Sequence, residues 1–554
     1  MAEYFEKVQW AVRPTVQVSP DRPRLGPVLT VNMGPVTHEE LRRAVRRLRR
    51  NRAKGVDEIP GEFWKLIMEE GTAAADWVLE FCETCWAGKQ VPEQWHLARV
   101  AAIFKKGKED DCANYRPISL LCVAYKMFAS VLLWRLKDAG AEERVWSTQY
   151  GFRGKRSTAH ALFVARRMIE ATWDQRDGKL LLLALDWAKA FDSVSPQALC
   201  GAMRRFGIPD GFIDMVRTIY ADRRFFVQDD GAKSGIKTQS FGISQGCPLS
   251  PFLFVIMMSV LMHDAAEAVE ATCGQTAVPY LVTRTLLYAD DTLILEGNEA
   301  VVQTYMENIA AVGKEYGLTF NWSKLELLRV RHEGHVRLPS GTNVKEKDVM
   351  VYLGGILSAD GRISSELSRR LGAAAADFSQ LETVWKHANI SRAQKVRICS
   401  ACVVEKLMYC LHTAVLNKSE LRKLDGFYAR CLRKIYGIQH AYWSRVSNKE
   451  VYKTAGRSPL RTRLLERQLY LFGEVALHGV EDPMRACVFE PDAFVPRKHT
   501  GTRRQGRPRQ TWAKAVHTHA VAAAGSQESM ESLVRDRLPW RAVVQKYCAN
   551  FGGG

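Results

Sequence analysis

The sequence predicts a mixed α/β core followed by a helical C-terminal part. Between about residues 95 and 330, short apolar runs with the composition of strands alternate with helical segments, a pattern typical of α/β domains. Beyond residue 365 the apolar spacing becomes helical, with segments near 365–386, 391–416, 418–437 and 457–479. The chain has 554 residues, which is too long for one hydrophobic core, so we expect three or four lobes.

A basic amphipathic helix is predicted over residues 37–54, THEELRRAVRRLRRNRAK. Thr37 and Glu40 form a capping-box pattern, and Leu41, Val45 and Leu48 share one face. The other face carries a run of arginines: Arg42, Arg43, Arg46, Arg47, Arg49 and Arg50. Such a run is ordinarily a solvated surface, but here no acidic partners follow Glu40. Because the arginines repel one another, we expect them to bind phosphate groups.

Four segments define the rest of the predicted core. The run LLLAL (181–185) is predicted to be a buried strand that ends at Asp186. The run FLFVIMMSVLM (252–262) is predicted to be a buried helix, introduced by two prolines. The stretch TLLYADDTLIL (285–295) is predicted to form strand, turn and strand, and VYLGGILSADG (351–361) a second short hairpin.

The charge balance points to a polyanionic partner. The chain has 79 Lys and Arg against 60 Asp and Glu, a net charge of +19, which favours nucleic acid or an acidic membrane surface. The longest apolar run is far below the roughly 20 residues that span a bilayer, and the first residues lack the pattern of a secretory signal. We therefore expect no membrane partner and an intracellular protein, in the nucleus and/or the cytoplasm.

The cysteines and the tail carry weaker signals. The 13 cysteines follow no disulfide framework, which suits a reducing compartment. The pairs Cys82/Cys85 and Cys399/Cys402 have the spacing of zinc ligands. Both lie in segments with helical apolar periodicity and have no matching His or Cys pair nearby, so we expect buried thiols. Residues 497–509, RKHTGTRRQGRPR, are basic and rich in glycine, and are predicted to form a flexible basic strap.

Three aspartates within apolar segments predicted to be strands are the strongest candidates for catalytic residues. Asp186 ends a predicted strand, while Asp290 and Asp291 occupy the predicted hairpin turn. A single aspartate there is commonly a plain turn residue, but three such carboxylates are costly to desolvate unless a cation compensates them. Together they predict an all-oxygen site for two Mg²⁺ ions, roughly 4 Å apart, that supports phosphoryl transfer. The spacing alone leaves polymerase and nuclease both open.

Ordered motifs resemble those of reverse transcriptases. LDWAKAFDSV, GISQGCPLSP and YADD resemble the palm motifs in order and spacing. Upstream, NRAKGVDEIPGEFWK (51–65), VPEQWHLARVAAIFKKGKEDDCANYRPISLL (91–121) and STQYGFRGKRST (147–158) resemble finger segments of non-LTR (LINE-like) retrotransposon enzymes. GLTFNWSK (317–324), YLGGILS (352–358) and segments as far as GRPRQTW (506–512) resemble their downstream regions. The resemblance covers about residues 35 to 515.

This resemblance implies a role for each catalytic candidate. Asp186 and Asp290 would be the principal ligands of two Mg²⁺ ions, with Mn²⁺ as an alternative, and Asp291 a weaker ligand. Lys324 resembles the lysine that protonates the leaving pyrophosphate, and Arg153 would contact the template backbone. An exposed surface charge is the alternative for Lys324.

The resemblance also implies a nucleotide pocket. Phe191 resembles the aromatic gate that packs under the sugar and excludes a 2′-hydroxyl, although a core aromatic is an ordinary alternative. Gln245 and Gly246 resemble the pair that lines the nucleotide, through a hydrogen bond and a close backbone approach. Lys105 and Arg116 match finger positions that hold the triphosphate. Ser244 and Leu325 depart from the usual Arg and Thr, which affects template grip and fine positioning.

The implied fold is an α/β (α+β) right-hand polymerase, with fingers and palm around an antiparallel catalytic hairpin, then a helical thumb and a basic C-terminal region. The expected divisions are an N-terminal extension (1–36), a basic helical part of the fingers (37–90), reverse transcriptase fingers and palm (91–358), a helical thumb (359–456) and a helical C-terminal region with a basic tail (457–554). No endonuclease, zinc knuckle or RNase H-like motif is recognisable, so we expect the polymerase portion alone.

The expected function is RNA-directed DNA polymerisation by a retrotransposon protein. The partners would be an RNA template, a DNA primer or target DNA, and dNTPs, with an endonuclease or an element-encoded RNA-binding protein acting in trans. One alternative is a domesticated or degraded reverse-transcriptase-like protein that binds nucleic acid without activity. Two further alternatives, an RNA-dependent RNA polymerase and a group II intron-type maturase, share palm motifs.

Overall fold

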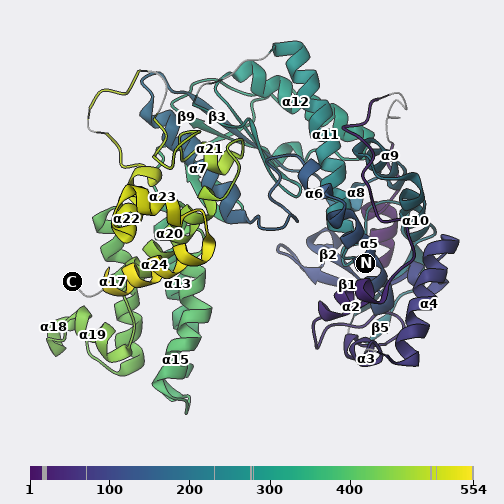
Figure 1. The fold of residues 1–554 in the computed structure, drawn as a ribbon, viewed down its shortest axis with the longest axis horizontal. Helices are drawn as coiled ribbons and strands as arrows, with labels where there is room; N and C mark the ends of the chain where they lie inside the picture. Colours follow the sequence, from purple (N-terminus) through teal and green to yellow (C-terminus); the bar gives the residue numbers. More distant parts are fainter. Residues whose placement is uncertain are drawn as a thin grey trace.

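The computed structural model describes residues 1–14, 22–69, 71–229, 231–274, 278, 280–498, 502–506 and 508–551. Two lobes stand on either side of a central sheet (Figure 1). The N-terminal lobe holds α2–α5, β1 and β2, and the C-terminal lobe holds the helices from α13 onward. Strands β3 and β9 lie between them. This arrangement confirms the predicted mixed α/β right-hand class.

A small sheet organises the N-terminal lobe. Strand β1 pairs with β2 in antiparallel and with β4 in parallel orientation, and β4 also pairs with β5 and β6. The elements are α2 (His38–Arg46), α3 (Gly61–Ile67), α4 (Ala73–Gly88), β1 (Leu97–Phe104), β2 (Tyr115–Leu120), α5 (Val123–Asp138), β4 (Arg224–Asp229), β5 (Ala232–Lys233) and β6 (Lys237–Thr238). Cys82 and Cys85 are buried in α4, as expected from its apolar spacing.

The predicted basic helix is present but shorter than expected. Thr37 and Glu40 form the capping box at the start of α2, and the helix ends at Arg46 instead of continuing to residue 54. The guanidinium groups of Arg43 and Arg47 lie 3.9 and 4.0 Å from the ring centroid of Trp134 on α5. Part of the arginine run therefore packs on protein, and its phosphate-binding role stays a prediction.

The central sheet has the order β10-β9-β3-β8-β7, with β3 in the middle. Its strands are β3 (Leu180–Leu185), β7 (Thr285–Tyr288), β8 (Asp291–Glu296), β9 (Glu326–Val330) and β10 (Lys345–Lys347). Alternate side chains of β3 enter two different cores: Leu181 and Leu183 join one, Leu180 and Leu182 the other. Because successive strand residues face opposite sides, both faces of β3 must be apolar, which explains its unbroken leucine run.

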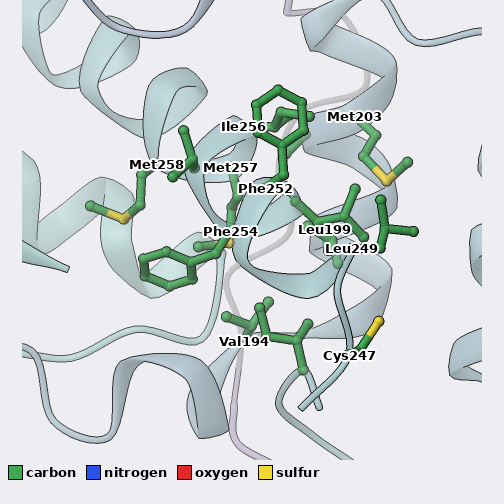
Figure 2. Packing of buried hydrophobic residues seen from close by; sticks show 14 of the residues in the cluster. Val194, Leu199, Met203, Cys247, Leu249, Phe252, Phe254, Ile256, Met257 and Met258 are labelled. Carbon is green, nitrogen blue, oxygen red and sulfur yellow. The ribbon is translucent and has the colours of Figure 1, made fainter. Parts of the chain in front are cut away.

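Helix α11 (Ser250–Cys273) fills the first of these cores beside α9 (Pro196–Phe206), α10 (Asp210–Tyr220) and α12 (Glu299–Glu315). Figure 2 shows Phe252, Phe254, Ile256 and two methionines of α11 among side chains from neighbouring segments. The helix runs well beyond the predicted 252–262, because the following alanines and glutamates favour helix. Among the described residues, α11 alone is long and apolar enough to cross a bilayer, but 78% of that window is buried inside the protein.

The C-terminal lobe is helical, as predicted. After the hairpin β11 (Val349–Tyr352) and β12 (Gly355–Ser358), which confirms the second predicted hairpin, its main helices follow. They are α13 (Ser364–Gln380), α14 (Glu382–His387), α15 (Arg392–Cys399), α16 (Glu405–Met408), α17 (Lys418–Tyr436), α18 (Ala441–Ser444), α19 (Asn448–Ala455), α20 (Leu460–Ala476), α21 (Pro483–Ala486), α22 (Trp512–Ala524), α23 (Gln527–Leu533) and α24 (Arg537–Phe551). Cys399 is buried and Cys402 is exposed, so only one thiol of this pair is buried as expected.

The end of the chain returns to the central sheet. Helices α20, α22 and α24 share one hydrophobic core with α7 (Thr158–Asp174), where the rings of Phe163 and Trp512 are 4.6 Å apart. The predicted basic strap, 497–509, approaches the end of α7: the Arg176 amide donates to the Thr502 carbonyl, and the Arg509 guanidinium lies 4.0 Å from the Trp173 ring. Residues 499–501 and 507 of this strap lie outside the described residues.

Candidate active site

The register of the central sheet brings the predicted aspartates to one edge. Strands β7 and β8 form a hairpin in which Tyr288 pairs with Asp291, and Ala289 and Asp290 make the turn. In the antiparallel pair β3–β8, Leu185 lies opposite Thr292, so the next residues along, Asp186 and Asp291, face each other. The carboxylates therefore meet because the leucine strand and the hairpin are neighbours.

A cation joins this edge from the other neighbour of β3. Ala184 lies opposite Glu326 on β9, and continuing that antiparallel register by two residues places Lys324 opposite Asp186. The Lys324 Nζ atom is 3.3 Å from Asp186 Oδ2, and both side chains are accessible to solvent, at 63% and 41%. The predicted pair of roles, metal ligand and proton donor, thus falls on two groups in contact.

The hairpin turn is fixed by Gln149, which sequence reasoning missed. The Gln149 Nε2 atom donates to the Ala289 carbonyl at 3.1 Å, and Gln149 Oε1 accepts from the amides of Ala289 and Gly151 at 2.8 Å. Ala289 has a φ of 57°, which an L-residue adopts only under constraint. A Cβ at Gly151 would lie 2.3 Å from the Ala289 nitrogen, so only glycine permits this approach.

One cavity of about 1070 Å³ collects the predicted site. Every substrate-binding and catalytic residue expected from the sequence lines it: Lys105, Arg116, Asp186, Phe191, Gln245, Gly246, Asp290, Asp291 and Lys324. These residues come from the two larger sheets and the segments next to their strands, from α8 (Ala190–Ser193), which carries Phe191, and from the loop before α11. Arg153 is not among the lining residues; its guanidinium donates to backbone carbonyls, including that of Glu142 at 2.9 Å.

The carboxylates carry excess negative charge. Loss of solvation, and then the charge of Asp186, raise the pKa of Asp290. Loss of solvation inside the cavity, followed by the charges of Asp290 and Asp186, raises the pKa of Asp291 to about 6 although its side chain remains accessible. Raised carboxylate pKa values mean that the ionised forms lack compensation. A bound cation would supply it.

The donor set suits a hard divalent cation. Within the described residues, no group of three or more His, Cys, Asp or Glu side chains is close enough to enclose a metal by itself. Mg²⁺ does not need such a cage, because it keeps several waters and takes further oxygens from substrate phosphates. Carboxylates with uncompensated charge, open to a large cavity, therefore fit this ion.

Two residues at one end of the β1–β2 hairpin bring positive charge to the same cavity. Lys105 follows β1, and Arg116 lies in β2 opposite Ile103, so the β1–β2 hairpin presents both at one end. The Lys105 amide donates to the Asn114 carbonyl at 2.8 Å, which closes this end of the hairpin. Burial lowers the pKa of Lys105, and the nearby Arg116 lowers it further. Two cations at close range form a receptor for a multiply charged anion.

The predicted gate and pocket residues have rigid supports. The Phe191 ring stacks on Phe254 of α11, with centroids 4.4 Å apart and an interplanar angle of 15°. Gly246 has a φ of 141°, and a Cβ there would lie 2.2 Å from the Ser119 carbonyl oxygen. The Ser119 amide also donates to the Gln245 carbonyl at 2.8 Å. Strand β2 thus fixes the loop that carries Gln245 and Gly246.

Asp192, another residue missed from the sequence, orients the Gln245 side chain. It is 4% exposed and accepts hydrogen bonds from Gln245 Nε2 at 3.0 and 3.1 Å. Gln9 Nε2 and Trp10 Nε1 donate to the same carboxylate at 2.7 and 2.9 Å. Trp10 is itself buried and packs edge-on against Phe225, with centroids 4.7 Å apart. The first residues, expected only as an extension, therefore support the wall of the cavity.

Comparison with known protein families agrees with this geometry. Residues 103–357 match the family described as reverse transcriptase (RNA-dependent DNA polymerase). That range holds all nine of the residues above that were given catalytic or pocket roles, from Lys105 and Arg116 to Lys324. A structural comparison with apo telomerase from Candida tropicalis covers 56% of the chain at 12% identity and a TM-score of 0.34, which is too low to support an argument.

Relatives extend the likeness beyond the central domain. The chain is 24% identical over 482 residues to the Pol polyprotein from type-1 retrotransposable element R2 of Popillia japonica, covering 81% of the chain and 64% of that protein. It is 25% identical over 427 residues to the RNA-directed DNA polymerase from mobile element jockey of Drosophila melanogaster, covering 74% and 45%. The chain thus spans less than two thirds of these relatives. Residues 103–357 belong to the reverse transcriptase family, and the chain is a relative of the proteins of non-LTR retrotransposons.

Proposed function

We propose that the chain is an RNA-directed DNA polymerase of a non-LTR retrotransposon, which extends a DNA primer on an RNA template with dNTPs. The observation that carries this proposal is the single cavity in which uncompensated carboxylates, a pair of finger cations and an aromatic ring converge. The carboxylates suit metal ions, the cations suit a triphosphate, and the ring suits a sugar. The alternative without activity has no use for concentrated negative charge in a protein of net charge +19.

Asp186 and Asp290 would hold two Mg²⁺ ions, or Mn²⁺ in their place, with Asp291 as a weaker ligand. Such ions activate the attacking 3′-hydroxyl and stabilise the leaving oxygens in phosphoryl transfer. Lys105 and Arg116 would bind the triphosphate, with Gln245 and Gly246 lining the nucleotide. The remaining partners, RNA template and primer or target DNA, would enter between the lobes.

Lys324 is proposed to protonate the departing pyrophosphate. Its ammonium group lies at the open side of the carboxylates, 3.3 Å from Asp186 Oδ2, and its side chain is mostly accessible. Released from that contact, it can follow the growing charge on the leaving group. An endonuclease or an RNA-binding protein encoded by the same element is proposed to act in trans, in the nucleus and/or the cytoplasm.

Primer extension tests this function. Purified protein with an RNA template, a DNA primer and Mg²⁺ is expected to incorporate dNTPs, and Asp290→Ala to reduce the rate on the order of 1000-fold, because a principal metal ligand is lost. Asp492→Ala, which removes an exposed carboxylate far along the chain, is the matched control and should extend normally. Equal extension by the Asp290 variant would reject the proposed site.

Sugar selection separates this function from an RNA-dependent RNA polymerase. Phe191→Ala is expected to raise ribonucleotide incorporation relative to dNTPs on the order of tenfold or more, because the ring that stacks on Phe254 no longer blocks a 2′-hydroxyl. The measurement is the ratio of kcat/KM for matched rNTP and dNTP. Wild-type preference for ribonucleotides, unchanged in the variant, would favour the RNA polymerase. Splicing of an intron RNA would favour a maturase.

The raised pKa of Asp291 predicts a pH-dependent stability that metal should suppress. The folded pKa of about 6 lies above the ordinary 3.8, so its stabilising contribution is full below pH 3.8 and is lost as the pH rises through 6. Asp291→Asn should therefore raise the free energy of unfolding at pH 8 in EDTA by roughly 1 kcal/mol, after allowance for solvent screening. The variant should accordingly melt at a higher temperature than the wild type under these conditions. At pH 3.5 the two proteins should melt alike, and Mg²⁺ should stabilise the wild type more than the variant. An equal difference in melting temperature between the two proteins at both pH values would contradict the predicted repulsion of the Asp291 carboxylate by its neighbours.

The contact between Asp192 and the first residues predicts a defect in nucleotide binding. Trp10→Phe keeps the ring against Phe225 but removes the indole donor to Asp192, so Gln245 is held less firmly. The KM for dNTP should rise about tenfold, with kcat and the Kd for primer–template within threefold of wild type, as for loss of a hydrogen bond to a charged group. Trp77→Phe, at an exposed tryptophan of α4, is the control. An unchanged KM for Trp10→Phe would show that the contact does not position the pocket.

A further inference from the structure

A large cleft of the C-terminal lobe has no part in the proposed polymerase site. It measures about 1440 Å³ and lies between α17, α19, α20, α22 and α24. None of its lining residues lines the cavity that holds Asp186. In Figure 1, α17 and α19 lie on the side of the lobe away from the N-terminal lobe, with α13 and α15 toward the opening between the lobes. The cleft is therefore separate from the cavity in which the polymerase chemistry is proposed.

The cleft is strongly basic. Its lining contains one carboxylate, that of Asp425, and six lysine and arginine side chains: Lys418, Arg422, Lys449, Lys453, Arg457 and Arg461. That carboxylate is already used, because Asp425 accepts hydrogen bonds from the Arg461 amide and guanidinium. Among the described residues, Lys418, Arg422, Lys453 and Arg457 form no ion pair with a carboxylate, and all four are exposed.

Like charges gathered in one concave surface repel one another and attract a polyanion. The cations come from two helices and the start of a third, so they line a length of cleft instead of one point. Asn417, Asn448, Gln468 and Gln510 add neutral amide groups to the same lining. This combination matches a phosphodiester backbone, whose charges repeat along its length and whose sugar oxygens accept hydrogen bonds.

Aromatic side chains outside the cleft lining, shortly before its residue Asn448 in the sequence, favour a nucleic acid over an acidic protein as the ligand. Tyr442 and Trp443, on the short helix α18 directly before α19, are 63% and 73% exposed. Their rings contact each other edge to face at 4.9 Å, and the Arg445 guanidinium lies 5.5 Å from the Tyr442 ring. Exposed rings beside cations provide stacking surfaces for unpaired bases.

We propose that this cleft is a second nucleic-acid-binding site, which holds single-stranded RNA or DNA by its phosphates while Tyr442 and Trp443 stack on its bases. The site does not depend on the polymerase activity, because binding needs neither the carboxylates nor a nucleotide. For a polymerase whose template is long, such a site would hold a distant part of the same strand outside the catalytic cavity.

Charge reversal with a matched control tests the site. Lys418→Glu/Lys453→Glu reverses two cleft charges, and Lys514→Glu/Lys546→Glu reverses two exposed lysines of α22 and α24 that do not line the cleft. Both double variants change the net charge equally. Binding of a 40-nucleotide RNA, and of DNA of the same sequence, is measured by fluorescence anisotropy at several salt concentrations without dNTPs or Mg²⁺.

The cleft variant is expected to bind either strand on the order of tenfold more weakly, and its log Kd should vary with log salt by about 1.4 less than in wild type, for two lost phosphate contacts. Trp443→Ala should weaken binding without changing the salt slope, because stacking is not ionic. Extension of a short primer–template should be unchanged in all three variants. Binding of poly-glutamate is measured with the same variants. If the two double variants bind RNA alike, or if the cleft variant loses as much affinity for poly-glutamate as for RNA, the proposal is overturned. Because binding is measured apart from synthesis, an inactive wild type would reject the polymerase function and leave this test intact.

Discussion

Mutual repulsion of carboxylates at one edge of the central sheet is the constraint on which the site depends. Asp186, Asp290 and Asp291 are brought together by strand register: burial and then the charge of Asp186 raise the pKa of Asp290, and burial and then the charges of Asp290 and Asp186 raise the pKa of Asp291. A flexible loop would let such groups separate. Here they cannot, because Asp186 follows a strand buried on both faces and the hairpin turn is held by Gln149. The apolar leucines therefore serve the chemistry directly: their packing opposes the repulsion and keeps the carboxylates available to a cation.

The cavity wall is assembled from segments that are far apart in the chain. Gln245 is oriented by Asp192, whose remaining acceptor capacity is filled by Gln9 and Trp10. A buried carboxylate without these donors would be expensive, so the first ten residues and the central domain stabilise each other. The β1–β2 hairpin makes a similar connection, since Ser119 holds the loop of Gly246 while Arg116, three residues earlier, faces the cavity. The proposed nucleotide pocket and the fold are thus supported by the same hydrogen bonds.

The local sequence pattern predicted those parts of the site that depend on neighbouring residues in the chain. The leucine strand, the hairpin and the position of Asp186, Asp290 and Asp291 follow from apolar runs interrupted by charge, and motif order placed Lys105 and Arg116 in the same cavity. Contacts between segments that are distant in the chain could not be predicted from such a pattern. The Trp10–Asp192 bond joins residues 182 positions apart, and nothing periodic in either segment announces it. The predicted ends of two helices were wrong for a related reason. Helix α2 ends at Arg46, next to Arg47, whose guanidinium packs on Trp134. Helix α11 continues to Cys273, because residues that favour helix follow the end of the apolar run.

Net charge and local charge act over different ranges in this molecule. The excess of +19 creates an attractive field for a polyanion, but salt limits the reach of each exposed cation to roughly 8–10 Å. Compensation of the carboxylates of the central sheet therefore falls to the cations that line their own cavity, among them Lys324, Arg116 and Lys105. Since Lys324 contacts Asp186 alone and the pKa of Asp291 remains raised, these cations leave the local excess unbalanced. A protein can in this way attract a polyanion with its whole surface and still retain, at one point, the negative charge that a metal ion requires.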